Sequence, residues 1–126
     1  MKTRVFVYGA LRKGASNAWR MERADFLGKA TVFGILVKVD WYPGLVLEGE
    51  TLVQGEVYEV DEQTLRELDE FEGIGVKDER NDEYKRVLAL AQLESGEEWE
   101  CSIYEWQLGV ANYEVVANGD WLTVAV

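Results

Sequence analysis

The sequence predicts an α+β fold in which a mixed, largely antiparallel sheet curls into a small barrel and carries one or two short helices. Three observations lead to this prediction: several short runs rich in β-branched and aromatic residues, glycines that interrupt those runs, and one segment with a helical period. With 126 residues, of which 48% are hydrophobic, the chain can bury one sizeable core. We therefore expect a single domain over residues 1–126.

The first half of the chain contains three predicted strands. They cover residues 4–8, 31–39 and 52–60. Gly34 interrupts the second of these runs and is expected to form a bulge or a close crossing. The only proline lies in Tyr-Pro-Gly at residues 42–44, which is predicted to break the chain between the second and third strands. A short helix or turn is predicted within residues 17–23.

The hydrophobic period changes after residue 60. Asp61 is a suitable helix N-cap, and apolar residues then recur every three positions, at Leu65, Leu68 and Phe71. Gly73 is predicted to terminate this helix.

The rest of the chain returns to strand patterns. Residues 84–93 and 99–106 are predicted strands joined by a hairpin turn at residues 94–97. The polar residues 74–83 are expected to form an exposed loop, and the tail holds a predicted turn at residues 118–120.

The composition excludes several kinds of chemistry. The chain has no histidine and one cysteine, Cys101, which rules out Ser–His–Asp and Cys–His nucleophiles, His-ligated zinc and thiolate metal clusters. Any proton transfer must therefore use a carboxylate, lysine, tyrosine or water. We expect no cofactor and no bound metal.

The charge and hydropathy patterns bear on partners and location. The formal net charge of −11 argues against nucleic acid and anionic membrane surfaces as partners. No apolar run approaches the ~20 residues that span a bilayer, and a single cysteine is compatible with a reducing compartment. We expect a cytoplasmic protein that binds a small molecule; the oligomeric state is left open.

The first candidate site is the glycine-rich segment that follows the first strand, residues 8–14. Glycines at a strand end allow backbone N–H groups to point into one concavity, which suits a carboxylate or an oxyanion. The segment is not a phosphate-binding Walker loop, because Ala15 follows Gly14 where that motif requires lysine. The alternative is that it is only a turn.

The second candidate is Glu72. At ~100° per residue it lies roughly 40° from Leu68, the centre of the apolar stripe of the predicted helix. A carboxylate on the core side loses water, which raises its pKa and makes it a useful general base and acid. The alternative is that the helix frays before Gly73 and that the side chain reaches water.

Acidic residues are concentrated around Glu72. Residues 67–83 contain eight acidic and two basic side chains, which is more than half of the net charge of the chain. The simpler interpretation is that these residues form a solvated acidic loop. The more specific interpretation is that their electric field favours a cationic ligand and raises the pKa of Glu72.

Two groups of motifs carry a resemblance to a known family. Residues 7–14 (Val-Tyr-Gly-Ala-Leu-Arg-Lys-Gly) resemble an opening of strand, Tyr-Gly-Thr-Leu and a basic-Gly segment, and Asn17 sits where such proteins often carry Asn. Residues 53–61 lead into Leu-Asp-Glu-Phe-Glu-Gly at residues 68–73, which matches a strand–helix block ending in Leu-Asp-x-Phe/Tyr-Glu-Gly. The Tyr-Lys-Arg of residues 84–86 supplies the Tyr-x-Arg that follows. On these motifs the chain is similar to the γ-glutamylcyclotransferase family, which includes γ-glutamylamine cyclotransferase and the AIG2-like proteins.

The resemblance runs from residue 4 to about residue 104 and implies both a fold and a reaction. The implied fold is a γ-glutamylcyclotransferase-like barrel. In the implied reaction, the α-amine of a γ-glutamyl compound attacks its own γ-carbonyl, releasing 5-oxoproline and an amine or amino acid. The resemblance assigns Glu72 as the general base and acid. It assigns substrate binding to five residues, Tyr8, Gly9, Ala10, Leu11 and Tyr84.

The chain departs from the family pattern in two places. Ala10 stands where the family usually has Thr or Ser. If this position acts through its N–H group, little is lost; if a hydroxyl group orients the substrate, a hydrogen bond worth roughly 1 kcal/mol is lost. The stretch between Glu72 and Tyr84 is longer than in close relatives; we expect it to border the pocket and to influence substrate choice. A weaker hypothesis is that its charge selects substrates whose leaving group is an additional cation, such as a polyamine.

Two alternative functions stay open from the sequence. One is a non-catalytic module on the same barrel that binds a small carboxylate. The other is a hydrolase with two carboxylates, such as a glycosidase, which needs a second carboxylate facing Glu72 that the sequence does not nominate.

Overall fold

The computed structural model describes residues 2–74 and 82–124. The strands are β1 (Lys2–Val7), β2 (Asp25–Lys38), β3 (Pro43–Asp61), β4 (Tyr84–Leu93), β5 (Glu98–Trp106) and β6 (Glu114–Val115). Within these residues the helices are α1 (Glu62–Phe71) and two short 3₁₀ helices, Ala18–Met21 and Trp121–Thr123. No helix in these residues is long and apolar enough to cross a membrane.

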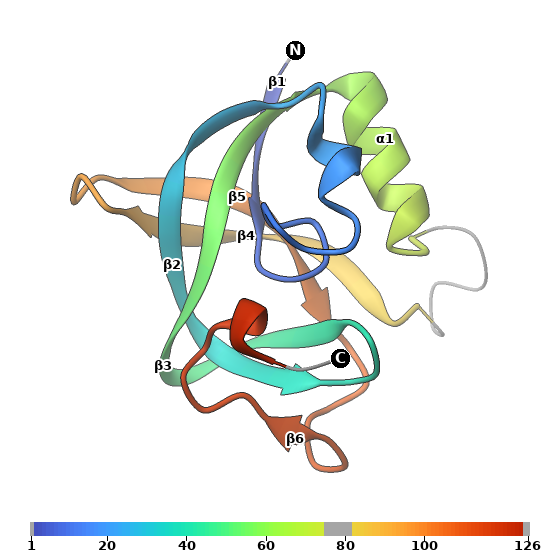
Figure 1. Ribbon diagram of the computed structural model, residues 1–126, viewed down its shortest axis with the longest axis vertical. Coiled ribbons are helices and arrows are strands. Elements are labelled where there is room, and N and C mark those ends of the chain that lie inside the picture. The colour runs from blue at the N-terminus through green and yellow to red at the C-terminus, as the bar shows by residue number, and fades with distance from the viewer. Residues whose placement is uncertain (1, 75–81, 125–126) are drawn as a thin grey trace.

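The strands form a closed barrel. They pair in the order β3-β1-β5-β4-β2, and β2 pairs again with β3, so that the sheet closes on itself (Figure 1). The β1–β5 pair is parallel and the other pairs are antiparallel, while the short β6 pairs with the last two residues of β2, Val37 and Lys38. The predicted class, a mixed and largely antiparallel barrel with short helices, is confirmed.

The predicted strand at residues 84–93 is confirmed as β4, and the other four strands begin earlier than predicted, β3 by nine residues. The predicted break at residues 42–44 is misplaced: the turn between β2 and β3 lies at residues 39–42, and Pro43 opens β3 opposite Lys38 of β2. Proline is tolerated as the first residue of a strand. The predicted bulge at Gly34 is confirmed by a register shift between Gly34 and Ile35, where a Cβ on the glycine would lie 2.7 Å from the carbonyl oxygen of Val46.

The helix begins and ends as its sequence signals indicate. The carboxylate of Asp61 accepts a hydrogen bond from the N–H of Thr64 at 2.8 Å, which caps the N-terminus. At the other end Gly73 has φ +78°, and the N–H groups of Gly73 and Ile74 return to the carbonyl oxygens of Glu70 and Asp69. This is a Schellman ending, and it leaves Glu72 as an ordered C-cap.

Alternating residues of β1 divide the core into two parts. Phe6 points into the barrel, whereas Val5 and Val7 point outward and pack in a second cluster with Leu68 of α1. The helix therefore covers one side of the barrel next to β1 and β3 (Figure 1). Most of the predicted exposed loop at residues 74–83 lies outside the described residues.

Candidate active site

A cavity of about 350 Å³ opens between the end of β1, the start of β3, the C-terminus of α1 and the start of β4. It brings together the catalytic candidate Glu72 and all five substrate-binding candidates from the sequence. Those five are Tyr8, Gly9, Ala10, Leu11 and Tyr84. They come from segments up to 76 positions apart, so the barrel topology rather than the chain order assembles this group.

The turn after β1 forms one wall. The N–H of Arg12 donates to the carbonyl oxygen of Gly9 at 3.0 Å, and the N–H of Asn17 donates to the carbonyl oxygen of Ala10 at 2.8 Å. Both carbonyl groups are therefore used within the protein. The N–H groups of Gly9, Ala10 and Leu11 donate to no residue in the described part of the chain, which leaves them as donors at the cavity.

Gly9 is required here because the turn presses against the start of β3. A Cβ at this position would lie 2.5 Å from Cγ of Pro43, well inside van der Waals contact. Pro43 in turn is fixed by Tyr84, whose hydroxyl donates to the Pro43 carbonyl oxygen at 2.5 Å. Tyr84 thus supports the wall formed by Gly9 as well as lining the cavity.

Glu72 lines the same cavity, at the end of α1. Its side chain is partly buried, and this burial raises the pKa of Glu72 to about 8. The Arg20 guanidinium opposes this rise, whereas the carboxylates of Asp69 and Glu83 add to it. The ordered helix end argues against the fraying alternative. Glu72 can therefore both accept and donate a proton near neutral pH.

Arg20 is a neighbour of Glu72 that the sequence did not nominate. It lies in the 3₁₀ helix after the turn, and its guanidinium packs 4.1 Å from the centre of the Phe71 ring at the end of α1. Its Nε donates to the side-chain oxygen of Asn17 at 3.2 Å, which holds it in place. In the sequence, only the position of Asn17 pointed to this segment as part of the site. That position does not indicate which arginine of the segment faces α1.

The tyrosines of the site stay neutral. The hydroxyl of Tyr8 donates to the carbonyl oxygen of Tyr104 at 2.5 Å, and burial together with the Glu72 carboxylate raises the pKa of Tyr8 well above its ordinary value. Burial also raises the pKa of Tyr84 far above the usual range. These phenols can donate hydrogen bonds, but they cannot serve as bases near neutral pH.

Two of the acidic side chains within residues 67–83 are paired with arginines. Asp69 accepts hydrogen bonds from Arg86 at 3.0 and 3.3 Å and from the Tyr104 hydroxyl at 2.7 Å, and Glu67 pairs with Arg23. Two of the eight acidic residues, at positions 78 and 79, lie outside the described residues.

The remaining described acids of that segment are Glu70, Glu72, Asp82 and Glu83, and all four line the cavity. No lysine or arginine does so within residues 2–74 and 82–124. Next to these carboxylates Trp41, 47% exposed, stacks edge-on against Tyr42 at a ring distance of 5.0 Å. The hydroxyl of Tyr42 donates to Glu83 at 3.1 Å. Across the same residues, no group of three acidic or cysteine side chains has the arrangement of a metal site.

Sequence reasoning missed the aromatic pair beside Pro43 as part of the site. The sequence pattern predicts only a chain break at residues 42–44 and gives Trp41 no role, although Trp41, Tyr42 and Pro43 line the cavity. The signal available was the single proline placed between two aromatic residues and a glycine.

Comparison with known proteins identifies the family. The family described as gamma-glutamyl cyclotransferase, AIG2-like, matches residues 5–123. The chain is 37% identical over 120 residues to the gamma-glutamylcyclotransferase family protein YtfP of Escherichia coli K12, covering 94% of this chain and 96% of that protein. It is 49% identical over 80 residues to the gamma-L-glutamyl-butirosin B gamma-glutamyl cyclotransferase of Niallia circulans, covering 61% of this chain and 51% of that protein.

A solved structure supports the same assignment. The crystal structure of an AIG2-like protein from Mus musculus superposes with a TM-score of 0.71 at 29% identity, over 89% of this chain and 82% of that one. Together with the match over residues 5–123, this shows that the chain belongs to the AIG2-like γ-glutamylcyclotransferase family of enzymes.

Proposed function

We propose that this protein converts a γ-glutamyl compound into 5-oxoproline and a free amine or amino acid, with Glu72 as the general base and acid. The observation that carries the proposal is that Glu72, with its pKa raised to about 8, lines the same cavity as residues 9–11, whose N–H groups donate to no residue in the described part of the chain. These are the two functions that an intramolecular cyclisation requires of a protein: orientation of the substrate and transfer of protons.

The turn after β1 is suited to hold the glutamyl end of the substrate. Its N–H groups at Gly9, Ala10 and Leu11 can donate to the α-carboxylate, and the buried side chains of Tyr8 and Tyr84 line the same cavity. Because Ala10 has no hydroxyl group, only its N–H group can take part. A substrate bound here would direct its α-ammonium toward Glu72.

The proton steps balance without a cofactor or a water molecule. Glu72 removes a proton from the α-ammonium, and the free amine then attacks the γ-carbonyl carbon to form the new C–N bond. The carbonyl electron pair moves onto oxygen and returns when the bond to the leaving nitrogen breaks. Glu72 delivers its proton to that nitrogen and the bond breaks. The carboxylate then takes the second proton, which the attacking nitrogen loses as it becomes the ring amide, and passes it to the released amine. The products are 5-oxoproline and the protonated amine, and the carboxylate of Glu72 is restored.

The raised pKa of Glu72 suits this proton transfer. Burial raises the pKa of Glu72 to about 8, which brings it closer to the pKa of an ammonium group than that of an ordinary carboxyl group is. Removing the proton from the substrate therefore costs less free energy, and the same group can act as an acid afterwards.

The leaving group is proposed to carry an additional positive charge. The carboxylates of Glu70 and Glu83 line the cavity together with Trp41, and a cation gains from both charge and an aromatic face. We expect γ-glutamyl-putrescine to react faster than γ-glutamyl-alanine at low salt, and the difference to shrink at high salt because exposed charges are screened. Equal rates at both salt concentrations would contradict this choice of substrate.

The deciding experiment is release of 5-oxoproline from a panel of γ-glutamyl dipeptides, γ-glutamyl amines and glutathione, with the wild type beside Glu72→Gln. Glutamine keeps the size of the side chain but cannot transfer the proton, so we expect activity in the wild type alone. Activity in both proteins would reject the role of Glu72. If neither protein releases 5-oxoproline but a small carboxylate raises the melting temperature, the result would favour the non-catalytic binding module. The two-carboxylate hydrolase has no support from the family match.

A further inference from the structure

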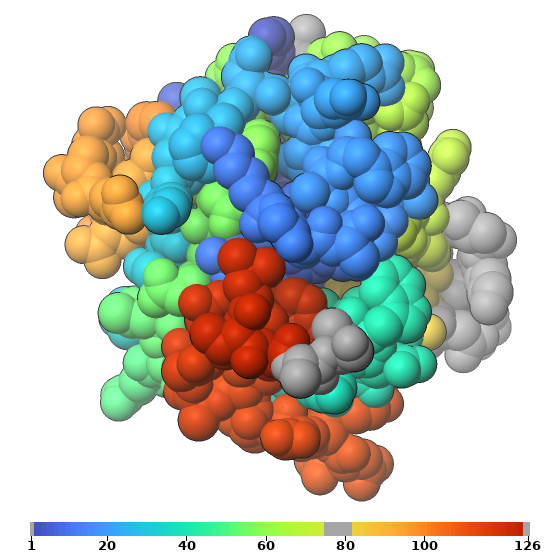
Figure 2. Space-filling model, viewed as in Figure 1, coloured from blue at the N-terminus to red at the C-terminus, as the bar shows by residue number. Residues whose placement is uncertain are grey.

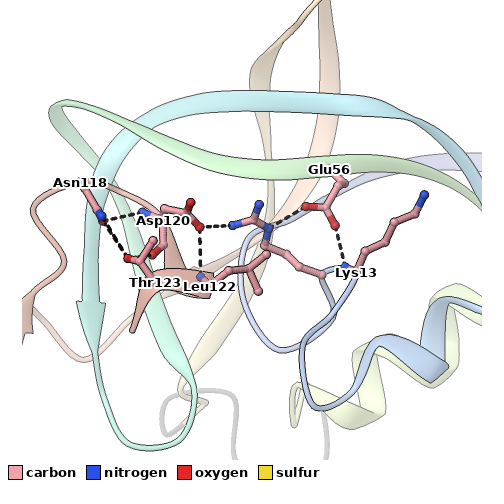
Figure 3. A network of polar contacts seen from close by, with 7 residues as sticks. Lys13, Glu56, Asn118, Asp120, Leu122 and Thr123 are labelled. Carbon is pink, nitrogen blue, oxygen red and sulfur yellow. Dashed lines mark hydrogen bonds and ion pairs between the residues drawn. The ribbon is translucent and has the colours of Figure 1, made fainter. Parts of the chain in front are cut away.

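Arg12 directly follows the cavity turn and is 7% exposed although it is charged. Its Nε donates to Oε2 of Glu56 at 2.6 Å, and its Nη1 donates to Oδ1 of Asp120 at 2.7 Å. The other oxygen of Glu56 accepts from the backbone N–H of Lys13 at 2.9 Å, and Figure 3 shows this network joining three separate segments. Arg12 is not among the described residues that line the cavity, so any effect on substrate must act through its neighbours.

Glu56 belongs to the barrel, and Asp120 belongs to a segment that is hydrogen-bonded to the barrel. Glu56 is buried in β3, where it pairs in register with Val7 of β1. Asp120 lies in the C-terminal segment, residues 118–123, which is attached to β3 because the N–H of Gln54 donates to the Gly119 carbonyl oxygen at 2.8 Å. Figure 2 shows this C-terminal segment in red, directly beside the loop that follows β1, in blue.

The guanidinium makes this connection directional. Its planar donors point in fixed directions, so Arg12 satisfies two carboxylates only in one orientation. The backbone N–H of Arg12 also closes the turn on the Gly9 carbonyl oxygen. The same residue thus fixes the turn through its backbone and fastens the turn to β3 and the C-terminal segment through its side chain.

We propose that Arg12, held by Glu56 and Asp120, is a positioning residue that sets the orientation of the N–H groups at Gly9, Ala10 and Leu11. The C-terminal segment, which does not line the cavity, therefore contributes to substrate binding. This inference rests on the proposed role of the turn in holding the glutamyl carboxylate. Those N–H groups contact the same carboxylate before and during the reaction, so that a disturbed turn raises KM and leaves kcat nearly unchanged.

The first test compares Asp120→Ala with a matched control in the same segment, Thr123→Val. Asp120→Ala removes one of the two anchors of Arg12 at a partly exposed residue and leaves the buried pair with Glu56 intact. Thr123→Val removes the hydrogen bond from the Thr123 hydroxyl to the Asp120 carbonyl oxygen at 2.7 Å and the one it accepts from the Asn118 amide at 3.0 Å, but it leaves the contact of the Asp120 carboxylate with Arg12. We expect KM to rise about tenfold in Asp120→Ala, with kcat within about twofold of wild type, and an unchanged KM in the control.

Two further variants distinguish the positioning of Arg12 from the role of Asp120 as the N-cap of the 3₁₀ helix Trp121–Thr123. The Asp120 carboxylate also accepts from the N–H of Leu122 at 3.1 Å, and Asp120→Asn keeps an acceptor for both Leu122 and Arg12. This variant should recover most of the wild-type KM. Arg12→Lys keeps the positive charge but replaces the planar guanidinium, which reaches both carboxylates, with a single ammonium group. This variant should raise KM as Asp120→Ala does.

A readout independent of activity distinguishes failure of this inference from failure of the proposed function. In ¹H–¹⁵N spectra of the ligand-free protein, the amide signals of Gly9, Ala10 and Leu11 should move in Asp120→Ala and stay in place in Thr123→Val. Unmoved amide signals would overturn the inference, and so would an unchanged KM or a loss confined to kcat. If the wild type releases no 5-oxoproline, the proposed function fails and the amide signals alone decide the positioning role.

Discussion

Replacing Glu72 with glutamine should change how the stability of this protein depends on pH. In the folded protein the pKa of Glu72 is raised from 4.5 to about 8, mainly by burial. Between these values the folded state keeps a proton that the unfolded state has lost, so the free energy of unfolding falls as the pH rises. The full difference corresponds to about 5 kcal/mol, of which about 3.5 kcal/mol is lost between pH 5 and pH 8.

Urea unfolding at pH 5 and pH 8, followed by tryptophan fluorescence, measures this directly. With a slope of about 1.5–2 kcal/mol/M, the wild-type midpoint should drop by about 2 M urea between the two pH values. In Glu72→Gln the midpoint should stay nearly constant, because no proton is bound or released at this position. The chain contains no histidine, so the side chain that most often titrates in this pH range does not interfere.

The matched control is Glu62→Gln, which neutralises an exposed acid in the first turn of the same helix. This variant should keep the wild-type fall between pH 5 and pH 8. Equal slopes in wild type and Glu72→Gln would refute the account of Glu72 as a carboxyl whose pKa is raised by burial. The value of kcat/KM should rise with pH through about 8 in the wild type, since the free enzyme must lose this proton to act as a base.

Three other substitutions test the cavity walls. Tyr84→Phe leaves the buried carbonyl oxygen of Pro43 without its donor, and the free energy of unfolding should fall by about 1–3 kcal/mol in urea titrations. Gly9→Ala places a Cβ 2.5 Å from Cγ of Pro43; we expect a loss of about 1–3 kcal/mol and a raised KM for any γ-glutamyl substrate, and a wild-type KM would contradict the packing argument. Arg20→Gln removes the cation that lowers the pKa of Glu72, so the rise of kcat/KM should move to higher pH, and a rise at lower pH would reverse the assigned sign.

The sequence by itself determined the elements whose signals are local. Helix α1 was predictable because its cap at Asp61, its apolar stripe and its terminating glycine all lie within 13 residues. The same short range placed Glu72 on the inward side of the helix, since three-residue spacings fix direction on a helix. The missing histidine excluded whole classes of chemistry without any structure, and the ordered motifs indicated the family.

The tertiary structure alone decided how these pieces meet. The hydrogen bond from Tyr84 to Pro43 joins residues 41 positions apart, and the pair of Arg12 with Asp120 joins residues 108 positions apart. Such contacts leave no periodic pattern, because each depends on how the barrel closes rather than on the neighbours of the residue in the chain. For the same reason the raised pKa of Glu72 required the structure: the helix pattern gives the direction of the side chain, but the packed walls around it determine how much water it loses.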